Sequence, residues 1–447
     1  DFCLSRGLGD VYKRQMMFHT LLQQGGDYIN QLRVDVTGVD PERFRAAWQA
    51  AVDCHDLLRG SFIWGELASP LQIIQREAQL PFAVHDWRGR DDLADALEAF
   101  AAADRAAGFD LVRPPLLRLT LIRLDAQRYH LIYTSHHILM DGWSNTRLLG
   151  EVLQRYHGSV PEQGPGRFRD YIAWLQRQNG EARQAFWTRQ LQDLDAPTLL
   201  ARATDWAAGS EGQGQVERVQ QLDARQTARL EAFARERRVT VNTVVQAAWL
   251  LVLQRYTGQA CVAFGATTAG RPAELKGIEQ QIGLFINTLP VIASPRPEQA
   301  LGDWLDTVQA LNIALREYDH TPLFDIQRWA GQGGEALFDS ILVFENYPVS
   351  EALQADTTSS LVFGEVANHE QTNYPLTLVV NLGTHLSLQL KADRARFSAR
   401  LAEQLGEHLL QVLQQMLESS AETALGELPM LSPQQAQAVL HLSLIHI

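Results

Sequence analysis

Two kinds of hydrophobic spacing alternate along this chain, and together they restrict the folds that it can adopt. In residues 32–36 apolar and polar side chains alternate one by one, which is the period of a half-buried strand. Asp40-Pro41-Glu42 then supplies an N-cap, a first-turn proline and a first-turn carboxylate. Apolar side chains next recur at three- and four-residue spacing, so we expect a helix that ends near His55. Its apolar stripe consists of Phe44, Ala47, Trp48, Ala51 and Val52.

The same succession of strand and helix patterns continues through the rest of the sequence. Strand patterns at 116–124 and 129–135 flank a turn at 125–127 and predict a hairpin. After a loop at 136–142, a new apolar stripe predicts a helix that stops at Gly158. Further strands are expected near 260–266, 337–344, 360–366, 376–382 and 386–390, and further helices near 168–178, 181–191, 224–237, 241–256 and 394–417. The predicted fold class is α+β, or mixed α/β.

A length of 447 residues exceeds what one hydrophobic core usually serves, so we expect two lobes. The opening residues lack the apolar segment and small-residue cleavage site of a signal peptide, and they read as foreign to the rest of the chain. The helix patterns on either side of residue 179 place the lobe boundary there. The expected organisation is a non-native leader at 1–15, an N-terminal lobe at 16–179, a C-terminal lobe at 180–424, a closing linker at 425–441 and a non-native tail at 442–447.

The composition excludes several classes of protein. The net charge of -13 argues against a nucleic-acid partner or an anionic membrane surface. Three cysteines are too few and too scattered for a disulfide framework or a zinc ribbon, so a reducing compartment, the cytoplasm, is expected. The apolar stretches are too short to span a bilayer, and no transmembrane segment is expected.

Two adjacent histidines lie at the end of the second predicted hairpin strand. Because side chains alternate along a strand, His136 and His137 point to opposite faces and cannot share one role. Asp141 follows where the chain leaves the strand, and Gly142 is expected in a backbone conformation closed to residues with a Cβ. Ser144 is expected to cap the next helix.

The loop residues alone leave more than one use open. The pair can be packed or solvated without any chemistry, or one histidine can face a substrate while Asp141 binds a cation that locks the loop. A metal site is not expected, because the adjacent histidines diverge and no further cluster of Cys, His or Glu stands nearby in the sequence.

The run from His136 to Ser144, HHILMDGWS, resembles the HHxxxDG motif of condensation domains from nonribosomal peptide synthetases. Other stretches resemble motifs of that family in the same order, so that the similarity covers roughly residues 16–440. They are CHDLLRGSF at 54–62, similar to RHExLRTxF; RDYIAW at 169–174, similar to YxDYAxW; IGLFINTLP at 282–290, similar to IGxFVNTLP; and LFDS at 337–340 with FENYP at 344–348. Of the first family motif, SPMQxGM, only the tail is present, at 16–19.

The resemblance implies a fold, an activity and partners. It implies two chloramphenicol-acetyltransferase-like lobes that form a V with a central tunnel. A donor aminoacyl or peptidyl thioester and an acceptor aminoacyl thioester enter on the phosphopantetheine arms of upstream and downstream peptidyl carrier proteins, and an amide bond forms between them. No covalently bound cofactor is implied. Residues 425–441 resemble the linker into an adenylation domain.

The resemblance also assigns roles to residues. His137 is the candidate catalytic residue, either as a general base or as a group that holds the amine or donates to the oxyanion, and these options stay open. His136 is expected to face away, Gly142 to matter through its backbone, and Asp141 to form an ion pair with Arg271 across the lobes. Trp143, Ser144 and Asn287 are candidate tunnel-lining residues, although Asn287 could equally satisfy buried backbone groups.

Related activities remain as alternatives. An epimerisation domain shares the His-His motif, and a silent recruitment module usually carries a broken one, whereas His136, His137, Asp141 and Gly142 are all present here. An acyltransferase that uses free coenzyme A would be expected to carry a DFGWG motif, which this sequence lacks. The run around the histidines and FENYP at 344–348 resemble the subtype that condenses an L-configured donor.

Overall fold

The computed structural model describes residues 3–5, 28–63, 71–161, 167–204, 212, 214–331, 336–345, 361–370 and 372–437. The chain divides into two compact units, and neither is continuous in sequence. Unit 1 comprises Asp1–Gln178, Ala269–Ile286 and Tyr347–Asn373, and unit 2 comprises Asn179–Thr268, Asn287–Asn346 and Tyr374–Ile447. The expected C-terminal lobe at 180–424 is therefore interrupted twice by segments that pack with unit 1.

The main sheet of unit 1 has the strand order β12-β2-β7-β6-β5, with β13 also paired to β2. The predicted hairpin is present, because β6 and β7 pair antiparallel, and β7 pairs antiparallel with β2. The strand expected at 360–366 is instead two short strands, which pair with the other edge of β2. The strands are β2 (Ile29–Thr37), β5 (Phe82–Asp86), β6 (Leu117–Arg123), β7 (Arg128–His136), β12 (Val362–Phe363) and β13 (Ala367–His369).

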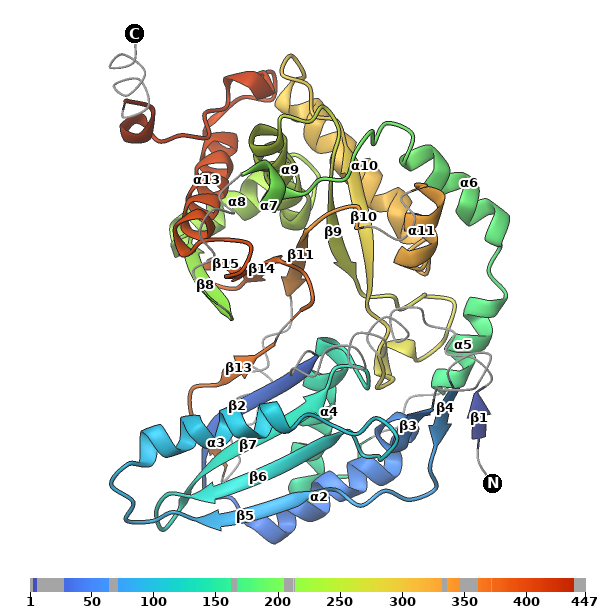
Figure 1. Cartoon of the computed structure of the whole chain (residues 1–447), viewed down its shortest axis with the longest axis vertical. Helices are drawn as coiled ribbons and strands as arrows, with labels where there is room; N and C mark the ends of the chain where they lie inside the picture. Colours follow the sequence, from blue (N-terminus) through green and yellow to red (C-terminus); the bar gives the residue numbers. More distant parts are fainter. Residues whose placement is uncertain are drawn as a thin grey trace. The chain divides into compact units, whose positions relative to one another are not determined.

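Helices cover both faces of this sheet, because apolar side chains of β7 point to both faces. Leu131 and Tyr133 of β7 join the core built with α2 and α4, and Trp48 of α2 lies 4.9 Å from the Tyr133 ring. Ile132, between them, faces the other way and contacts the cluster of Ala101 on α3, which lies across that face in Figure 1. These helices are α2 (Pro41–Cys54), α3 (Leu93–Ala107) and α4 (Gly142–Tyr156).

The remaining elements of unit 1 are short. A small sheet has the order β1-β4-β3, and α5 packs Tyr171 and Ile172 against Ile278 and Phe285. These elements are β1 (Cys3–Ser5), η1 (Asp56–Arg59), β3 (Gly60–Ile63), β4 (Leu71–Ile74), α5 (Phe168–Gln176) and η3 (Ile278–Gln280).

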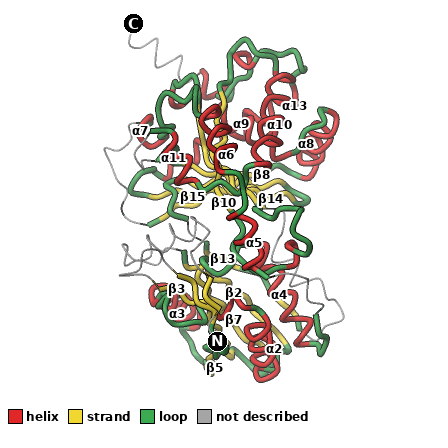
Figure 2. Tube along the Cα trace, turned by 90° about the vertical axis from the view of Figure 1, so that its right-hand side faces the viewer, coloured by secondary structure: helices red, strands yellow, loops and turns green. Residues whose placement is uncertain are grey.

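Unit 2 is built on a sheet of order β10-β9-β11-β14-β15-β8, in which β11 runs parallel to both β9 and β14. Helices α8, α9, α10 and α13 gather on one side of these strands (Figure 2). Helix α9 contacts both α10 and α13, and its residues from Thr243 to Leu253 are all buried. The strands are β8 (Gln215–Gln221), β9 (Val262–Thr268), β10 (Asn287–Ala293), β11 (Ser340–Glu345), β14 (Leu376–Leu382) and β15 (Leu386–Asp393).

The helices that were predicted in unit 2 begin and end close to the expected positions, except that α13 starts at Ala399 instead of 394, whereas the helices at 200–203, 301–317 and 323–329 were not predicted. Ser398 caps that helix by accepting a hydrogen bond from the Leu401 amide, and Asp393 to Phe397 form a turn before it. The helices are α6 (Gly180–Gln190), α7 (Leu200–Ala203), α8 (Ala224–Glu236), α9 (Val241–Thr257), α10 (Leu301–Glu317), α11 (Leu323–Trp329), α13 (Ala399–Glu418) and η4 (Leu425–Glu427).

The mixed α/β class predicted from the sequence is confirmed, since both units combine a sheet with packed helices. Within the described ranges, no helix has the length and apolar character that crossing a bilayer would require.

Candidate functional site

The loop after β7 is held by backbone hydrogen bonds and by the burial of its own apolar side chains. His137 donates its amide proton to the Tyr28 carbonyl oxygen at 2.8 Å, and the Leu139 amide donates to the His136 carbonyl at 3.1 Å. Ile138, Leu139 and Met140 are all buried in the core of unit 1. A loop with three anchored apolar residues holds the neighbouring polar groups in one geometry.

His136 lies fully inside unit 1. Its ring stacks near Tyr28 and meets Phe109 edge to face, and its Nδ1 accepts a hydrogen bond from the Ile138 amide at 3.1 Å. Burial, with a smaller contribution from His137, lowers the pKa of His136 to about 3. The ring is therefore neutral at physiological pH, and it stabilises the loop by accepting the hydrogen bond from the Ile138 amide.

His137 is half-buried and has a defined tautomer. Its Nδ1 lies 3.0 Å from the carbonyl oxygen of Met140, and a carbonyl oxygen only accepts, so Nδ1 carries the proton. In the neutral ring the lone pair then sits on Nε2. The loop thus presents His137 as a proton acceptor at Nε2.

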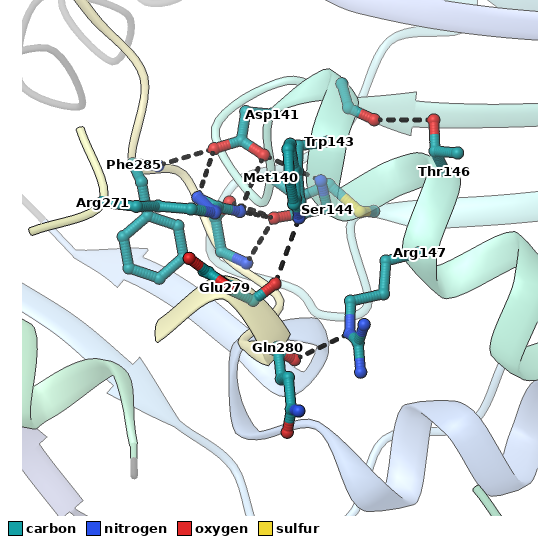
Figure 3. Close-up of polar contacts among 12 residues, drawn as sticks. Met140, Asp141, Trp143, Ser144, Thr146, Arg147, Arg271, Glu279, Gln280 and Phe285 are labelled. Carbon is teal, nitrogen blue, oxygen red and sulfur yellow. Dashed lines mark hydrogen bonds and ion pairs between the residues drawn. The ribbon is translucent and has the colours of Figure 1, made fainter. Parts of the chain in front are cut away.

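Asp141 caps helix α4, and its carboxylate is the centre of the contacts drawn in Figure 3. Oδ1 accepts from the Ser144 amide at 2.8 Å, and Oδ2 accepts from the Phe285 amide at 3.0 Å. Arg271 donates to both oxygens at 3.2 Å. The prediction that Ser144 caps α4 is wrong. Asp141 is the N-cap, because its backbone is extended and its short side chain reaches the Ser144 amide.

Arg271 forms the predicted pair with Asp141, and both side chains are only 5% exposed. Its guanidinium carbon lies 4.1 Å from the centre of the Phe285 ring. Burial lowers the pKa of Arg271, and the Asp141 carboxylate acts in the opposite direction. The expectation that this pair joins two lobes is not met, since Ala269–Ile286 belongs to the same compact unit as Asp141.

The first two turns of α4 are hydrogen-bonded to the segment 279–285. The Ser144 hydroxyl donates to the Gly283 carbonyl at 2.8 Å and accepts from the Gly283 amide at 3.1 Å and from Arg271 at 2.7 Å. Trp143 donates its indole proton to the Glu279 carbonyl, and Arg147 donates to that of Gln280 (Figure 3). The Ser144 hydroxyl thus donates its one proton and accepts two hydrogen bonds, which is its full capacity. Its role in the structure is to join α4 to the segment 279–285, and not to line a tunnel as predicted.

Gly142 does not have the left-handed backbone that its position suggested. It is the first residue of α4, with φ outside the positive range. A Cβ built on it would meet no heavy atom within 4 Å. Its amide is one of the helix N-terminal N–H groups that have no intrahelical partner. The space around the Cβ position of Gly142 is open.

Asn287 begins β10 in unit 2 and is held by backbone groups. Its side-chain nitrogen donates to the carbonyl oxygens of Asp319 at 2.8 Å and Thr321 at 2.7 Å, which uses both amide protons. Its Oδ1 accepts from the Thr288 amide. Of the two roles expected for Asn287, these contacts match the one in which its side chain satisfies backbone groups.

The other stretches that carry the family resemblance are mainly structural where they are described. Buried Arg59 donates to the carbonyls of Val52, Asp53 and Gln75, which ties η1 to the end of α2. Tyr171 of α5 packs its ring 5.0 Å from Phe285 and so supports the segment that binds α4. Residues 16–19 and 346–348 lie outside the described residues.

The structure also joins residues that sequence reasoning did not connect. His55 Nε2 lies 2.6 Å from Glu151 Oε2, although 96 residues separate them in sequence. Cys54 lies beside this pair. The amphipathic patterns of α2 and α4 signalled that each has a buried face, but no sequence signal indicated which helices would pack together.

Comparisons of the sequence point to one family. The model of the Condensation domain family matches residues 8–440. A linear gramicidin synthase chain of Brevibacillus parabrevis is 42% identical over 393 residues, which are 86% of this chain and 8% of that protein. Chondramide synthase cmdD of Chondromyces crocatus is 39% identical over 378 residues, 83% of this chain and 10% of that protein. The chain thus spans a small part of these relatives.

Solved structures share the fold at low sequence identity. The first condensation domain of the calcium-dependent antibiotic synthetase, in complex with a substrate analogue, matches with a TM-score of 0.76 at 19% identity, over 95% of this chain and 99% of that chain. A four-domain nonribosomal peptide synthetase bound to AMP and glycine matches with a TM-score of 0.81 at 18% identity, over 98% of this chain and 35% of that chain.

Proposed function

The chain belongs to the condensation-domain family of nonribosomal peptide synthetases, whose members catalyse amide-bond formation, and from this premise we propose that His137 is its catalytic residue. The proposed reaction joins a donor aminoacyl or peptidyl thioester to the amine of an acceptor aminoacyl thioester. The observation that carries the assignment is the hydrogen bond from His137 Nδ1 to the Met140 carbonyl.

That hydrogen bond favours a general base over an oxyanion donor. With Nδ1 protonated, Nε2 accepts a proton in the neutral ring and could donate only after the imidazole is charged. The acceptor amine attacks the thioester carbonyl carbon, and a proton of that amine passes to Nε2. The C–S bond then breaks, and the same proton neutralises the departing thiolate.

Gly142 supplies the second part of the proposed chemistry. The tetrahedral intermediate places a negative charge on the former carbonyl oxygen, which needs a donor nearby. The Gly142 amide begins α4, where the helix dipole is positive, and the open space beside it accommodates a substrate oxygen. Asp141 and Arg271 hold that amide in place through the segment 279–285.

The substrates and partners follow from the family and are part of the same proposal. Both substrates arrive on the phosphopantetheine arms of peptidyl carrier proteins, and the domain itself needs no bound cofactor. Residues 425–441 continue into an adenylation domain. The donor has the L configuration, and the synthetase works in the cytoplasm, which agrees with the small number of cysteines, three, in the sequence.

A condensation assay with two aminoacyl carrier proteins tests the function. The wild-type chain should produce a dipeptide on the acceptor carrier, and His137→Ala should reduce its rate about 10²- to 10⁴-fold while folding normally. His385→Ala, at an exposed histidine in the turn before β15, is the matched control and should keep the wild-type rate.

The outcomes separate the candidate functions. Dipeptide formation that depends on His137 supports the proposal. No dipeptide from the wild type refutes condensation and leaves the recruitment module, whereas inversion of the donor α-carbon without dipeptide indicates an epimerisation domain. Equal rates for the wild type and His137→Ala would remove the direct role of His137.

A further inference from the structure

Three side chains of different chemistry converge at the contact between α2 and α4 in unit 1. They are the thiol of Cys54, the imidazole of His55 and the carboxylate of Glu151, and one ligand atom from each lies within 4.8 Å of the others. Each is half-buried, so a small ion can reach the group while bulk water is partly excluded. From this arrangement we propose that Cys54, His55 and Glu151 form a zinc site.

The polar contacts already orient two of the three groups. His55 Nε2 lies 2.6 Å from Glu151 Oε2, and the two side chains are 19% and 11% exposed. Arg155 binds the other oxygen, Oε1, through two nitrogens at 2.9 and 2.7 Å. The carboxylate is thus held by Arg155 on one oxygen, as ligating carboxylates commonly are by a second residue. Zinc would take the place of the proton between Oε2 and His55 Nε2, and that proton and the Cys54 thiol proton would pass to solvent.

The geometry requires only a small local opening. Two ligands on tetrahedral Zn²⁺, with bonds of about 2.0–2.2 Å to nitrogen and oxygen, are roughly 3.4 Å apart. The present separation of 2.6 Å between His55 Nε2 and Glu151 Oε2 must therefore increase by roughly 0.8 Å. Cys54 and Glu151 lie on helices α2 and α4, and His55 directly follows α2, so we expect side-chain rotation to provide this opening.

The donor set selects the ion. A thiolate, an imidazole and a carboxylate together suit Zn²⁺, whereas Mg²⁺ and Ca²⁺ prefer oxygen ligands alone. Three protein ligands leave a fourth position for water. Cys54 stands where the family pattern RHExLRTxF has arginine, so the thiol is a feature of this chain and not of that pattern.

Binding would join the end of α2 to the middle of α4. Glu151 lies on the same helix that begins with Gly142, and α2 and α4 share one core. An ion that binds only the folded arrangement stabilises it by mass action, so Zn²⁺ should raise the melting temperature of the chain. The proposal does not depend on the condensation activity, because its readouts are metal binding and stability.

The test uses Co²⁺ as a spectroscopic substitute in the full chain after chelator treatment. All proteins carry Cys3→Ser, which leaves Cys54 and Cys261 as the two thiols of the chain. We expect a thiolate-to-cobalt charge-transfer band that saturates at one equivalent and disappears when Zn²⁺ is added. Zn²⁺ alone should raise the melting temperature.

Variants decide whether the band comes from this site. Cys54→Ser and Cys54→Arg should both lose the band and the thermal shift, and the arginine restores the family residue in case serine impairs folding. Cys261→Ser, at a buried thiol in unit 2, should keep both. The absence of a band from the protein with wild-type Cys54, or an undiminished band in either Cys54 variant, would overturn the zinc site.

Discussion

Two neighbouring histidines at the end of β7 show how strongly position alone differentiates identical side chains. His136 is fully buried, accepts a hydrogen bond from the Ile138 amide and stays neutral. His137, one residue on, donates from Nδ1 to Met140 and is half-buried. Strand alternation predicted that the two would diverge, and the contacts of each ring define what it can do.

Buried His136 should make the folding stability of this chain depend on pH. The unfolded chain binds a proton at this residue below about pH 6.5, whereas the folded chain does so only near pH 3. The contribution of neutral His136 to the free energy of unfolding is therefore fully present above pH 6.5. As the pH falls from 6.5 towards 3, the free energy of unfolding decreases by up to about 1.4 kcal/mol per pH unit.

His136→Asn should flatten that dependence, because the Asn side-chain oxygen still accepts from the Ile138 amide but does not titrate. Denaturant unfolding between pH 7 and pH 5 measures the difference in slope. His385→Asn, at an exposed position, should retain the wild-type slope. Parallel curves for the wild type and His136→Asn would contradict the assigned pKa.

At the scale of elements, the dominant feature is the joint between the first turn of α4 and the segment 269–286. Asp141 combines three functions there, since it caps the helix, pairs with Arg271 and accepts from the Phe285 amide. An exposed N-cap performs only the first. Asp223 of α8 is such a cap, with a reciprocal bond to Gln226.

Asp141→Ala should therefore destabilise the chain by much more than Asp223→Ala. Loss of a simple cap costs about 1 kcal/mol, whereas an arginine left buried and unpaired costs about 3–5 kcal/mol. Urea unfolding of both variants provides the comparison. Similar losses for the two would mean that the pair with Arg271 contributes little.

Gly270 precedes Arg271 and allows the segment to approach closely. Its φ is +58°, and an added Cβ would lie 1.8 Å from the Phe285 carbonyl oxygen. Gly258, at the end of α9, has a similar φ of +68° but open space around the Cβ position. Alanine substitutions at these two positions therefore distinguish the cost of a left-handed backbone from the cost of steric overlap.

Gly258→Ala should cost about 1–2 kcal/mol for the left-handed backbone alone. Gly270→Ala should cost about 1–3 kcal/mol more, because the Phe285 backbone must move and weaken its bond to Asp141. The same unfolding measurement checks both variants. If the two losses are equal, the close approach is not required.

At the scale of the whole molecule, the first unit is assembled from distant parts of the chain. Ile282, Leu284 and Leu361 belong to the same buried cluster as Val34 and Leu131. Strands β12 and β13 pair with β2 across more than 300 residues of sequence. The N-terminal part alone therefore lacks part of its core and the partners of Asp141.

A fragment that ends at Gln178 should consequently fail to fold cooperatively. It would expose apolar surface otherwise covered by 282–284 and 361, and it would leave the Asp141 carboxylate without Arg271. Near-ultraviolet circular dichroism and a thermal melt test this, with the full chain as control. A cooperative melt of the fragment would show that the later segments are dispensable.

Many local elements and the identity of the site loop could be predicted from the amino-acid sequence. Spacing located many of the strands and helices, because a strand repeats every two residues and an amphipathic helix every three to four, although α3, α10 and α11 were not predicted. The motif around His136 and His137 led to the condensation-domain family, which the comparisons confirm. Backbone details were less predictable: Gly142 is helical, and Asp141 instead of Ser144 caps α4.

Which distant groups come into contact depends on how the helices and strands pack in three dimensions. Arg271 could be named as a partner of Asp141 from the resemblance, but its place in the same compact unit depends on a segment that returns late in the chain. The contact of Cys54 and His55 with Glu151 arises because α2 and α4 pack on one face of the sheet. Periodicity shows that a face is buried, whereas packing selects its neighbour, and burial then sets the protonation state of groups such as His136.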